Sequence, residues 1–243
     1  HGETEGDAAD ENLYYAFRCS LYVPPVDRAL EIGNDYMAKY PSGQYFDPLT
    51  LAMGQIYASR QDWPEVIRHF SETLRINPDH QDAAECIFLL SYAYFMQEQF
   101  DDCAKWLRHM MSKYPDNPRT EDGTYWLGMA LTFSKKYDEA ALEFDTLLEK
   151  YPDTIYREDS SYRRGVCDYG VSDYANAEVR FNKFVAEFPE SKLIGETYMM
   201  LADIAAYFGG DRLREACQLF QRAMDDQNLN VELYNYCAFR CGE

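Results

Sequence analysis

The stretch LLEKYPDT, residues 147–154, ends a helix-like run in Lys-Tyr-Pro, and the same tripeptide stands at residues 39–41 and 113–115. These prolines belong to a series in which each lies 37 residues after the last: Pro41, Pro78, Pro115, Pro152 and Pro189. A proline disfavours helical backbone in the residue before it, and a lysine in the last turn suits the helix dipole. The ending is therefore a stop-and-turn signal in a chain built from stacked repeats.

Apolar residues recur upstream of each proline at spacings of three and four, the helical period, and each unit holds two such runs. In the third full repeat the runs cover residues 121–134 and 137–151. The first helices carry a column of small residues, and the second helices carry a column that is mostly aromatic. The small column is Gly54, Ser91, Gly128, Gly165 and Ala202, and the ring column is Phe70, Leu107, Phe144 and Phe181. We expect small residues to let two antiparallel helices approach closely and rings to fill the space between them.

The residues Leu127-Gly128, Leu131, Ala140, Phe144 and Pro152 resemble the tetratricopeptide (TPR) repeat. The resemblance covers about residues 13–228 and implies an all-α fold, a right-handed α-solenoid of stacked antiparallel helix hairpins. The chain departs from the repeat in three ways. Thr124 stands where the repeat has a Trp, and the period is 37 in place of about 34, with the extra residues in the loop after the proline. The last repeat has a longer hairpin at Gly209-Gly210, which places Ala216, Phe220 and Ala223 two positions late.

The predicted organisation has three parts. Residues 1–12 are expected to form a disordered acidic tail. Residues 13–228 form the solenoid, with an atypical first unit over 13–41 followed by five repeats. Residues 229–243 are expected to add a helix, either as a cap or as the start of a truncated repeat.

The endings Tyr151-Pro152-Asp153-Thr154 and Phe188-Pro189-Glu190-Ser191 are similar to those of long-period TPRs in bacterial envelope proteins. That group includes proteins of the β-barrel assembly lipoprotein and Tol–Pal coordinator types. The resemblance implies the bacterial periplasm or envelope, with the cytoplasm as the alternative compartment.

The formal net charge is −19, and the body remains strongly acidic without the five acids of the first eleven residues. Because nucleic-acid affinity comes mainly from Lys and Arg, this charge argues against a nucleic-acid partner. It favours a protein or peptide partner with basic flanks. No apolar run approaches the length that spans a bilayer, so no transmembrane segment is expected.

The sequence offers no catalytic constellation. Its four histidines lie far apart, its seven cysteines include no Cys-x-x-Cys pair, and no phosphate-binding loop or nucleophile elbow occurs. We therefore expect no enzyme, no metal and no cofactor. The odd number of scattered cysteines favours small buried side chains over a disulfide framework.

A binding surface remains, and in a TPR solenoid the first helices form the concave face that binds peptides. The predicted groove positions are aromatic, aliphatic and Met side chains on these helices: Tyr14, Phe88, Tyr92, Tyr125, Met129, Tyr162, Val166 and Met199. Such residues are enriched in interface cores, but several of them could equally pack between repeats. An acidic row at the starts of the same helices (Glu11, Glu85, Asp122, Asp159, Glu196) is interpreted first as partners of the helix dipole.

Arg164 stands in a column that elsewhere is Met or Leu, and Asp168 lies four residues later on the same helix face. Arg164 could lay its methylenes on the core and carry its head to solvent. Alternatively, the two residues form a partly buried pair that marks a polar site shared with Arg163 and a partner carboxylate.

The leading functional hypothesis is thus a protein-binding scaffold that holds an apolar partner segment with basic flanks in the groove. The alternative is a structural or self-associating module, a fragment of a longer solenoid.

Overall fold

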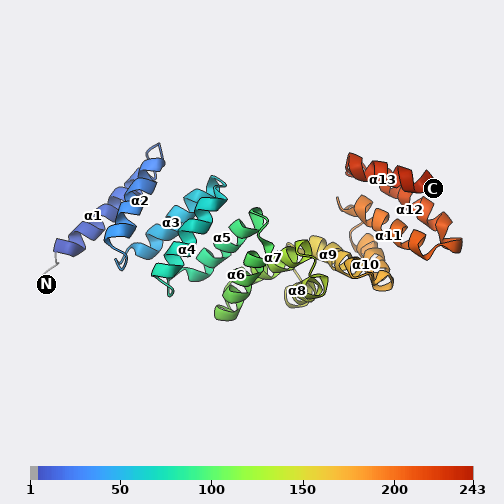
Figure 1. Ribbon diagram of the computed structural model, residues 1–243, viewed down its shortest axis with the longest axis horizontal. Coiled ribbons are helices and arrows are strands. Elements are labelled where there is room, and N and C mark those ends of the chain that lie inside the picture. Colours follow the sequence, from blue (N-terminus) through green and yellow to red (C-terminus); the bar gives the residue numbers. More distant parts are fainter. Residues whose placement is uncertain (1–4, 243) are drawn as a thin grey trace. The chain divides into compact units, whose positions relative to one another are not determined.

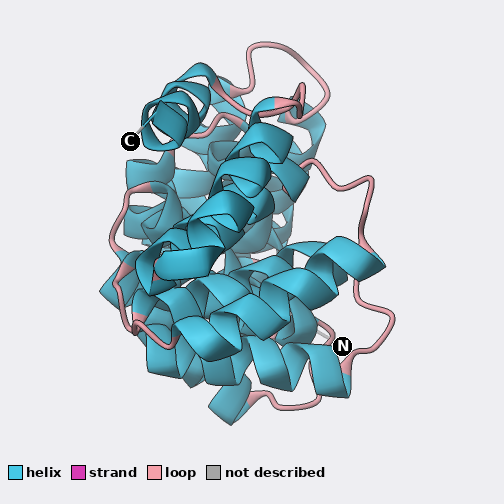
Figure 2. Cartoon of the chain, turned by 90° about the vertical axis from the view of Figure 1, so that its right-hand side faces the viewer, coloured by secondary structure: helices cyan, strands magenta, loops and turns pink. Residues whose placement is uncertain are grey.

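The structure of the protein, a computed structural model, describes residues 5–242, and within them the chain forms thirteen α-helices, one 3-10 helix and no strand (Figure 2). The contacts divide the chain into two compact units, one up to Gly123 and one from Thr124. The first unit contains α1 (Glu5–Ser20), α2 (Asp27–Lys39), α3 (Phe46–Ser59), α4 (Trp63–Ile76), α5 (Ala83–Met96) and α6 (Phe100–Lys113), labelled in Figure 1. The boundary falls within α7 (Arg119–Phe133), and the second unit continues with α8 (Tyr137–Lys150), α9 (Arg157–Gly170), α10 (Tyr174–Glu187), α11 (Ile194–Phe208), η1 (Gly210–Arg212), α12 (Leu213–Met224) and α13 (Val231–Gly242).

Within each unit, consecutive helices pack as hairpins, and each hairpin stacks on the next. The pairs α1–α2, α3–α4 and α5–α6 make up the first unit, and α9–α10 and α11–α12 recur in the second. The all-α fold of stacked helix hairpins is therefore confirmed.

The contact between the small column and the ring column is as close as the sequence indicates. A Cβ atom added at Gly54 would lie 2.0 Å from Cζ of Phe70, a separation that real Cβ atoms essentially never show. The other contacts of this kind join Gly128 to Phe144 at 2.8 Å and Gly165 to Phe181 at 2.7 Å. The second-helix ring thus lies directly on the backbone of the first helix, which only a very small residue allows.

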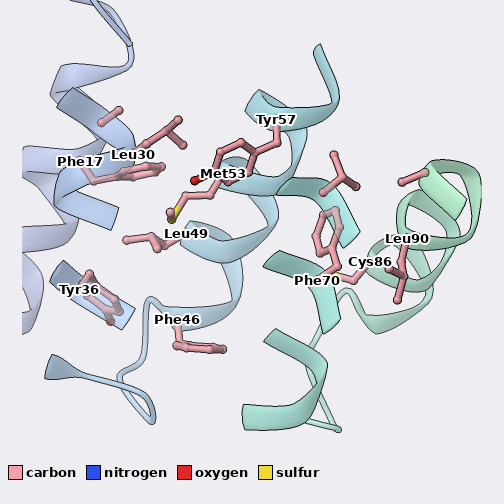
Figure 3. Close-up of a cluster of buried hydrophobic side chains, with 13 residues drawn as sticks. Phe17, Leu30, Tyr36, Phe46, Leu49, Met53, Tyr57, Phe70, Cys86 and Leu90 are labelled. Carbon is pink, nitrogen blue, oxygen red and sulfur yellow. The ribbon is translucent and has the colours of Figure 1, made fainter. Parts of the chain in front are cut away.

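The first hairpin reverses this arrangement. Phe17 occupies the small column and is fully buried, whereas Gly33 occupies the ring column. A Cβ atom at Gly33 would lie 2.3 Å from Sδ of Met53 in the next hairpin. Figure 3 shows Phe17 and Met53 in one buried cluster that joins the first two hairpins. Each hairpin therefore still combines one large and one small residue.

The tight hairpin turns share one residue with positive φ, at positions that are 37 residues apart. These residues are Gln61, Glu98, Lys135 and Ser172, with φ between 56° and 64°. The next residue donates its N–H to the carbonyl oxygen five positions earlier, as Lys136 does to Leu131 at 2.8 Å. This is the Schellman ending of an α-helix. The last hairpin instead turns through Gly209 and Gly210 into η1, and α12 consequently begins later, as the sequence predicts.

The residues that lengthen the repeat to 37 lie in the loops after the prolines, and these loops share one hydrogen bond. In four loops a polar side chain accepts the backbone N–H of the residue two positions on: His80 from Asp82, Asn117 from Arg119, Thr154 from Tyr156 and Ser191 from Leu193, at 2.9–3.2 Å. The corresponding residue of the first loop is Gly43, which has no acceptor. There the hydroxyl of Tyr36 accepts the N–H of Tyr45 at 3.1 Å.

The expected disordered tail is wrong over residues 5–12, because α1 already begins at Glu5. The cause is a buried contact: Asp10 is almost completely covered and accepts a hydrogen bond from the Tyr36 hydroxyl of α2. Residues 1–4 lie outside the described residues. At the other end, the additional helix is α13, which packs on α12, and residue 243 lies outside the described residues.

We predict that Gly54→Ala destabilises the first unit by about 1–3 kcal/mol, because Phe70 must move to make room for the methyl group. This loss should exceed the gain in helix propensity of about 1 kcal/mol that Ala provides. The measurement is urea unfolding followed by circular dichroism. The control is Gly54→Ala combined with Phe70→Leu, which imitates the natural pair Ser91 and Leu107. An unchanged midpoint in the single variant would contradict the close contact.

A second prediction concerns His69 of α4, which is buried with Nε2 2.7 Å from the carbonyl oxygen of Thr50. Burial lowers the pKa of His69 from 6.5 to about 4. Below pH 6.5 the unfolded chain therefore binds a proton at this residue that the folded chain does not bind. The stability gained from neutral His69 is complete above pH 6.5 and is lost as the pH falls toward 4, by roughly 3 kcal/mol.

The measurement is the free energy of unfolding between pH 7 and pH 4 for the chain and for His69→Gln, whose amide can still donate to Thr50. The difference between the two should shrink on acidification. The exposed His109→Gln should follow the parent chain, and parallel curves for His69→Gln and the parent would refute the assignment.

Candidate functional site

The structure buries most of the predicted groove positions. Five of the eight are less than one-tenth exposed: Phe88, Tyr125, Met129, Tyr162 and Met199. The other three, Tyr14, Tyr92 and Val166, are partly buried. The buried members are therefore covered in the chain by itself, which agrees with the packed alternative that the sequence left open; partner binding by the set stays a prediction.

In the second unit, tyrosines join each repeat to the next. The ring of Tyr125 stacks on Tyr156 with centroids 4.0 Å apart, and its hydroxyl donates to Asp159 at 2.9 Å. The hydroxyl of Tyr162 donates in the same way to Glu196 at 3.1 Å. Burial, and then the neighbouring carboxylate, raise the pKa of both tyrosines. These acids of the acidic row thus serve as acceptors between repeats in addition to meeting the helix dipole.

The first unit uses the same positions with different chemistry. Tyr14 stacks on Tyr45, with centroids 4.3 Å apart and planes 6° from parallel. At Phe88 the covering group is the guanidinium of Arg119, 4.8 Å above the ring, and Glu85 holds this guanidinium with two hydrogen bonds of 2.6 and 2.9 Å. These contacts fix the stacking of the hairpins and leave little of the rings for a partner.

An open pocket does exist on the first-helix face of the second unit. It has a volume of 230 Å³ and is lined by Tyr169 of α9, Tyr174 of α10, Tyr207 of α11 and Tyr236 of α13, together with Asp203 and Arg240. Three of its rings form a chain, with centroids 5.3 Å apart between Tyr169 and Tyr174 and 4.5 Å apart between Tyr174 and Tyr207. Tyr207 is 68% exposed, so a ring is presented to solvent at the mouth of the pocket.

The polar side of the pocket is a fixed network. Asp203 accepts hydrogen bonds from the hydroxyl of Tyr236 and from Arg240, both at 2.8 Å. The Arg240 guanidinium also lies 5.6 Å from the ring centres of Phe220 and Tyr236. Burial raises the pKa of Asp203, and the two hydrogen bonds oppose this shift. The network positions α13 against α11 and presents a paired carboxylate and guanidinium beside the rings.

Two residues of this pocket, Asp203 and Tyr236, could be predicted from the repeat period. Asp203 belongs to the same column as Tyr92, Met129 and Val166. Tyr236 lies 37 residues after Met199, so the period carried the signal for it, although the groove prediction stopped at Met199. Tyr169, Tyr174 and Tyr207 lie near hairpin turns, and only the packed structure brings them together.

The predicted polar site is a network of four charges, with a largely buried pair at its centre and two more exposed partners. Arg164 and Asp168 form the expected pair, and their side chains are 12% and 10% exposed. Asp145 of α8 accepts from Arg164 at 2.9 Å, and Arg180 of α10 lies 3.3 Å from Asp168. The interpretation that carries the Arg164 head to solvent is wrong, because the side chain is covered and its guanidinium pairs with Asp168 and with Asp145 of the neighbouring helix. Arg163 is separate and pairs with Asp159 at 2.9 Å.

Among the described residues, no three His, Cys, Asp or Glu side chains gather in a group that could hold a metal ion. Burial raises the pKa of the Cys103 thiol to about 12 and that of Cys167 to about 11, which makes poor nucleophiles of both. Across residues 5–242, we find no helix with the length and apolar character that crossing a bilayer requires.

Comparison with known proteins supports a TPR repeat protein. A family model described as a tetratricopeptide repeat matches residues 122–154. No curated protein sequence matches the chain. A solved TPR protein from Parabacteroides merdae ATCC 43184 is 14% identical, covers 97% of this chain and 100% of its own, and superposes with a TM-score of 0.60. MamA from residue 41 onward of Desulfovibrio magneticus RS-1 is 17% identical, covers 79% of this chain and 96% of its own, and has a TM-score of 0.62. At these identities the likeness shows the fold.

We predict that Arg164→Met and Asp168→Leu each destabilise the second unit by roughly 1–3 kcal/mol, because each removes the nearest partner of a largely buried charge and leaves it only its second partner, on a neighbouring helix. The double variant should recover most of this loss, since the pair is removed together. Urea unfolding of the four chains gives the coupling energy. The control is Lys183→Met, which breaks an exposed pair with Glu187 and should cost under about 1 kcal/mol. Additive single effects would show that the network is not coupled.

Proposed function

We propose that the chain is a non-enzymatic scaffold that binds a partner segment on the first-helix face of its second unit. The anchor is the pocket formed by Tyr169, Tyr174, Tyr207 and Tyr236 with the Asp203–Arg240 pair. The observation that carries the proposal is the exposed Tyr207 ring beside a preformed pocket of 230 Å³, on the face where the hairpins align their first helices. The TPR likeness supports a protein partner.

The pocket suits one side chain of an extended or helical segment. Tyrosine rings supply rigid contact area at low entropic cost, and their hydroxyls provide hydrogen bonds at the rim. We infer an apolar or aromatic anchor residue, which stacks among the rings while neighbouring backbone groups reach Arg240 or Tyr236. The network that holds these two residues is already formed, so little ordering is needed on binding.

The charge of the chain determines which residues are favourable on either side of the partner's anchor. With a net charge of −19, the protein attracts a segment that carries Lys or Arg on either side of its anchor. The same charge disfavours nucleic acid and acidic peptides. Binding should therefore weaken as the ionic strength rises.

The envelope is our proposed compartment, with the cytoplasm as the alternative. It is supported by the endings Tyr151-Pro152-Asp153-Thr154 and Phe188-Pro189-Glu190-Ser191, which are similar to those of bacterial envelope TPRs. Fractionation of bacteria that express the complete natural gene would test this. Recovery with cytoplasmic markers would contradict the envelope assignment.

The binding proposal is tested on an array of short peptides that vary in apolar content and in the sign of their flanking charges. We predict that apolar peptides with Lys or Arg flanks bind best. Tyr207→Ala should lower the affinity for the tightest-binding peptide by at least about tenfold, because the ring is a central contact. Since Tyr207 is largely exposed, this variant should keep its helicity.

The matched control is Tyr22→Ala in the first unit, which removes an even more exposed ring and should leave binding unchanged. Equal binding by Tyr207→Ala and the parent chain would place the site elsewhere. A preference for acidic peptides would contradict the partner chemistry. Light scattering that shows a stable oligomer of the parent chain and a monomer of Tyr207→Ala would favour the self-associating module instead.

A further inference from the structure

Two accessible thiols lie together where the last two helices meet. Cys217 of α12 is exposed and Cys241 of α13 is partly exposed. Cys241 packs on the cluster around Phe220, Cys217 lines a hollow together with Phe220 and Arg240, and the two thiols interact across this contact between α12 and α13. The cysteines Cys86, Cys103, Cys167 and Cys237 are buried instead. The pair therefore combines proximity with access for a small oxidant, a combination that none of these four buried cysteines has.

The pair sits beside the proposed binding pocket. Cys241 directly follows Arg240, and Cys217 lines a neighbouring hollow of 450 Å³ together with Phe220 and Arg240. Helix α13 is attached through the buried Cys237 and through Leu233, which packs on the cluster around Phe220.

The opposite side of α13 is open, with Val231 74% and Phe239 65% exposed. A helix held from one side opens more readily than one packed on both sides. Two pocket residues, Tyr236 and Arg240, depend on its position.

We propose that Cys217 and Cys241 form an intramolecular disulfide that fastens α13 to α12 and thereby holds Tyr236 and Arg240 in the pocket. The bond itself is independent of the proposed function, whereas its effect on partner binding rests on it. Oxidation would then favour the binding-ready pocket, because a crosslink restricts the open states of the chain between residues 217 and 241.

The chemistry is thiol–disulfide exchange with a small-molecule disulfide such as glutathione disulfide. The more exposed Cys217 attacks as the thiolate, forms a mixed disulfide and releases one glutathione. Cys241 then attacks Sγ of Cys217, and the second glutathione leaves. The two protons of the cysteine thiols end on the two glutathione molecules, and the two electrons lost by the cysteine sulfurs reduce the glutathione disulfide.

The test incubates the full chain with glutathione disulfide and follows intact mass and peptide maps. We expect the loss of two hydrogen atoms and a peptide pair linked through Cys217 and Cys241. Cys217→Ser should prevent the link, whereas Cys19→Ser, which removes another exposed thiol, should not. A chain that carries only glutathione adducts, or a link between other cysteines, would overturn the proposal.

Hydrogen exchange then tests the consequence for α13. Oxidation should slow exchange of the α13 amides by about tenfold or more in the parent chain, and dithiothreitol should reverse this. Unchanged exchange in the linked chain would overturn the fastening of α13.

The tightest peptide of the array provides the last comparison. Oxidised chain should bind it several-fold more tightly than reduced chain, with no such difference in Cys217→Ser. Equal affinities would refute the regulatory effect. If no peptide in the array binds, the proposed function fails, and the mass and exchange results still decide whether the bond forms and holds α13.

Discussion

The structure depends on one contact that recurs in the hairpins: a second-helix side chain pressed against a small residue of the first helix. At Gly54, Gly128 and Gly165 the ring lies where a Cβ atom would be. This contact lets the two helices approach closely, and the first hairpin keeps one large and one small residue with the positions exchanged, at Phe17 and Gly33. Because the contact repeats with the prolines, the stacking of hairpins and the placement of their first-helix faces follow from it.

The sequence predicted the helices and their turns well, because these depend on local features. The tripeptides that end in Pro115 and Pro152 give the helix ends, and the additional residues at Gly209 and Gly210 correctly predict the late start of α12. The residue two positions after each proline of the series from Pro78 onward also forms a repeating column of hydrogen-bond acceptors, and this column is a sequence signal for the conformation of the loops. The tail prediction failed since composition alone could not show that Asp10 meets Tyr36.

The candidate site was harder to predict, because an aromatic residue on a first helix can face either a neighbouring repeat or a partner. Tyr125 and Tyr162 are buried by contacts with the following repeat, through acceptors 34 residues further on. Tyr207 is also a tyrosine on a first helix, but its side chain is largely exposed to solvent. The spacing of three and four residues identifies the helix face, and only the packed structure separates its covered positions from its open ones.

Nuclear Overhauser effects in solution test the central contact most directly. The account predicts strong effects between the Hα protons of Gly54, Gly128 and Gly165 and the ring protons of Phe70, Phe144 and Phe181, respectively, together with upfield ring-current shifts of those Hα signals. Absence of these effects in an otherwise helical, folded chain would show that the helices of a hairpin stand further apart. In that case the close contact between small residue and ring could not be what organises the repeats.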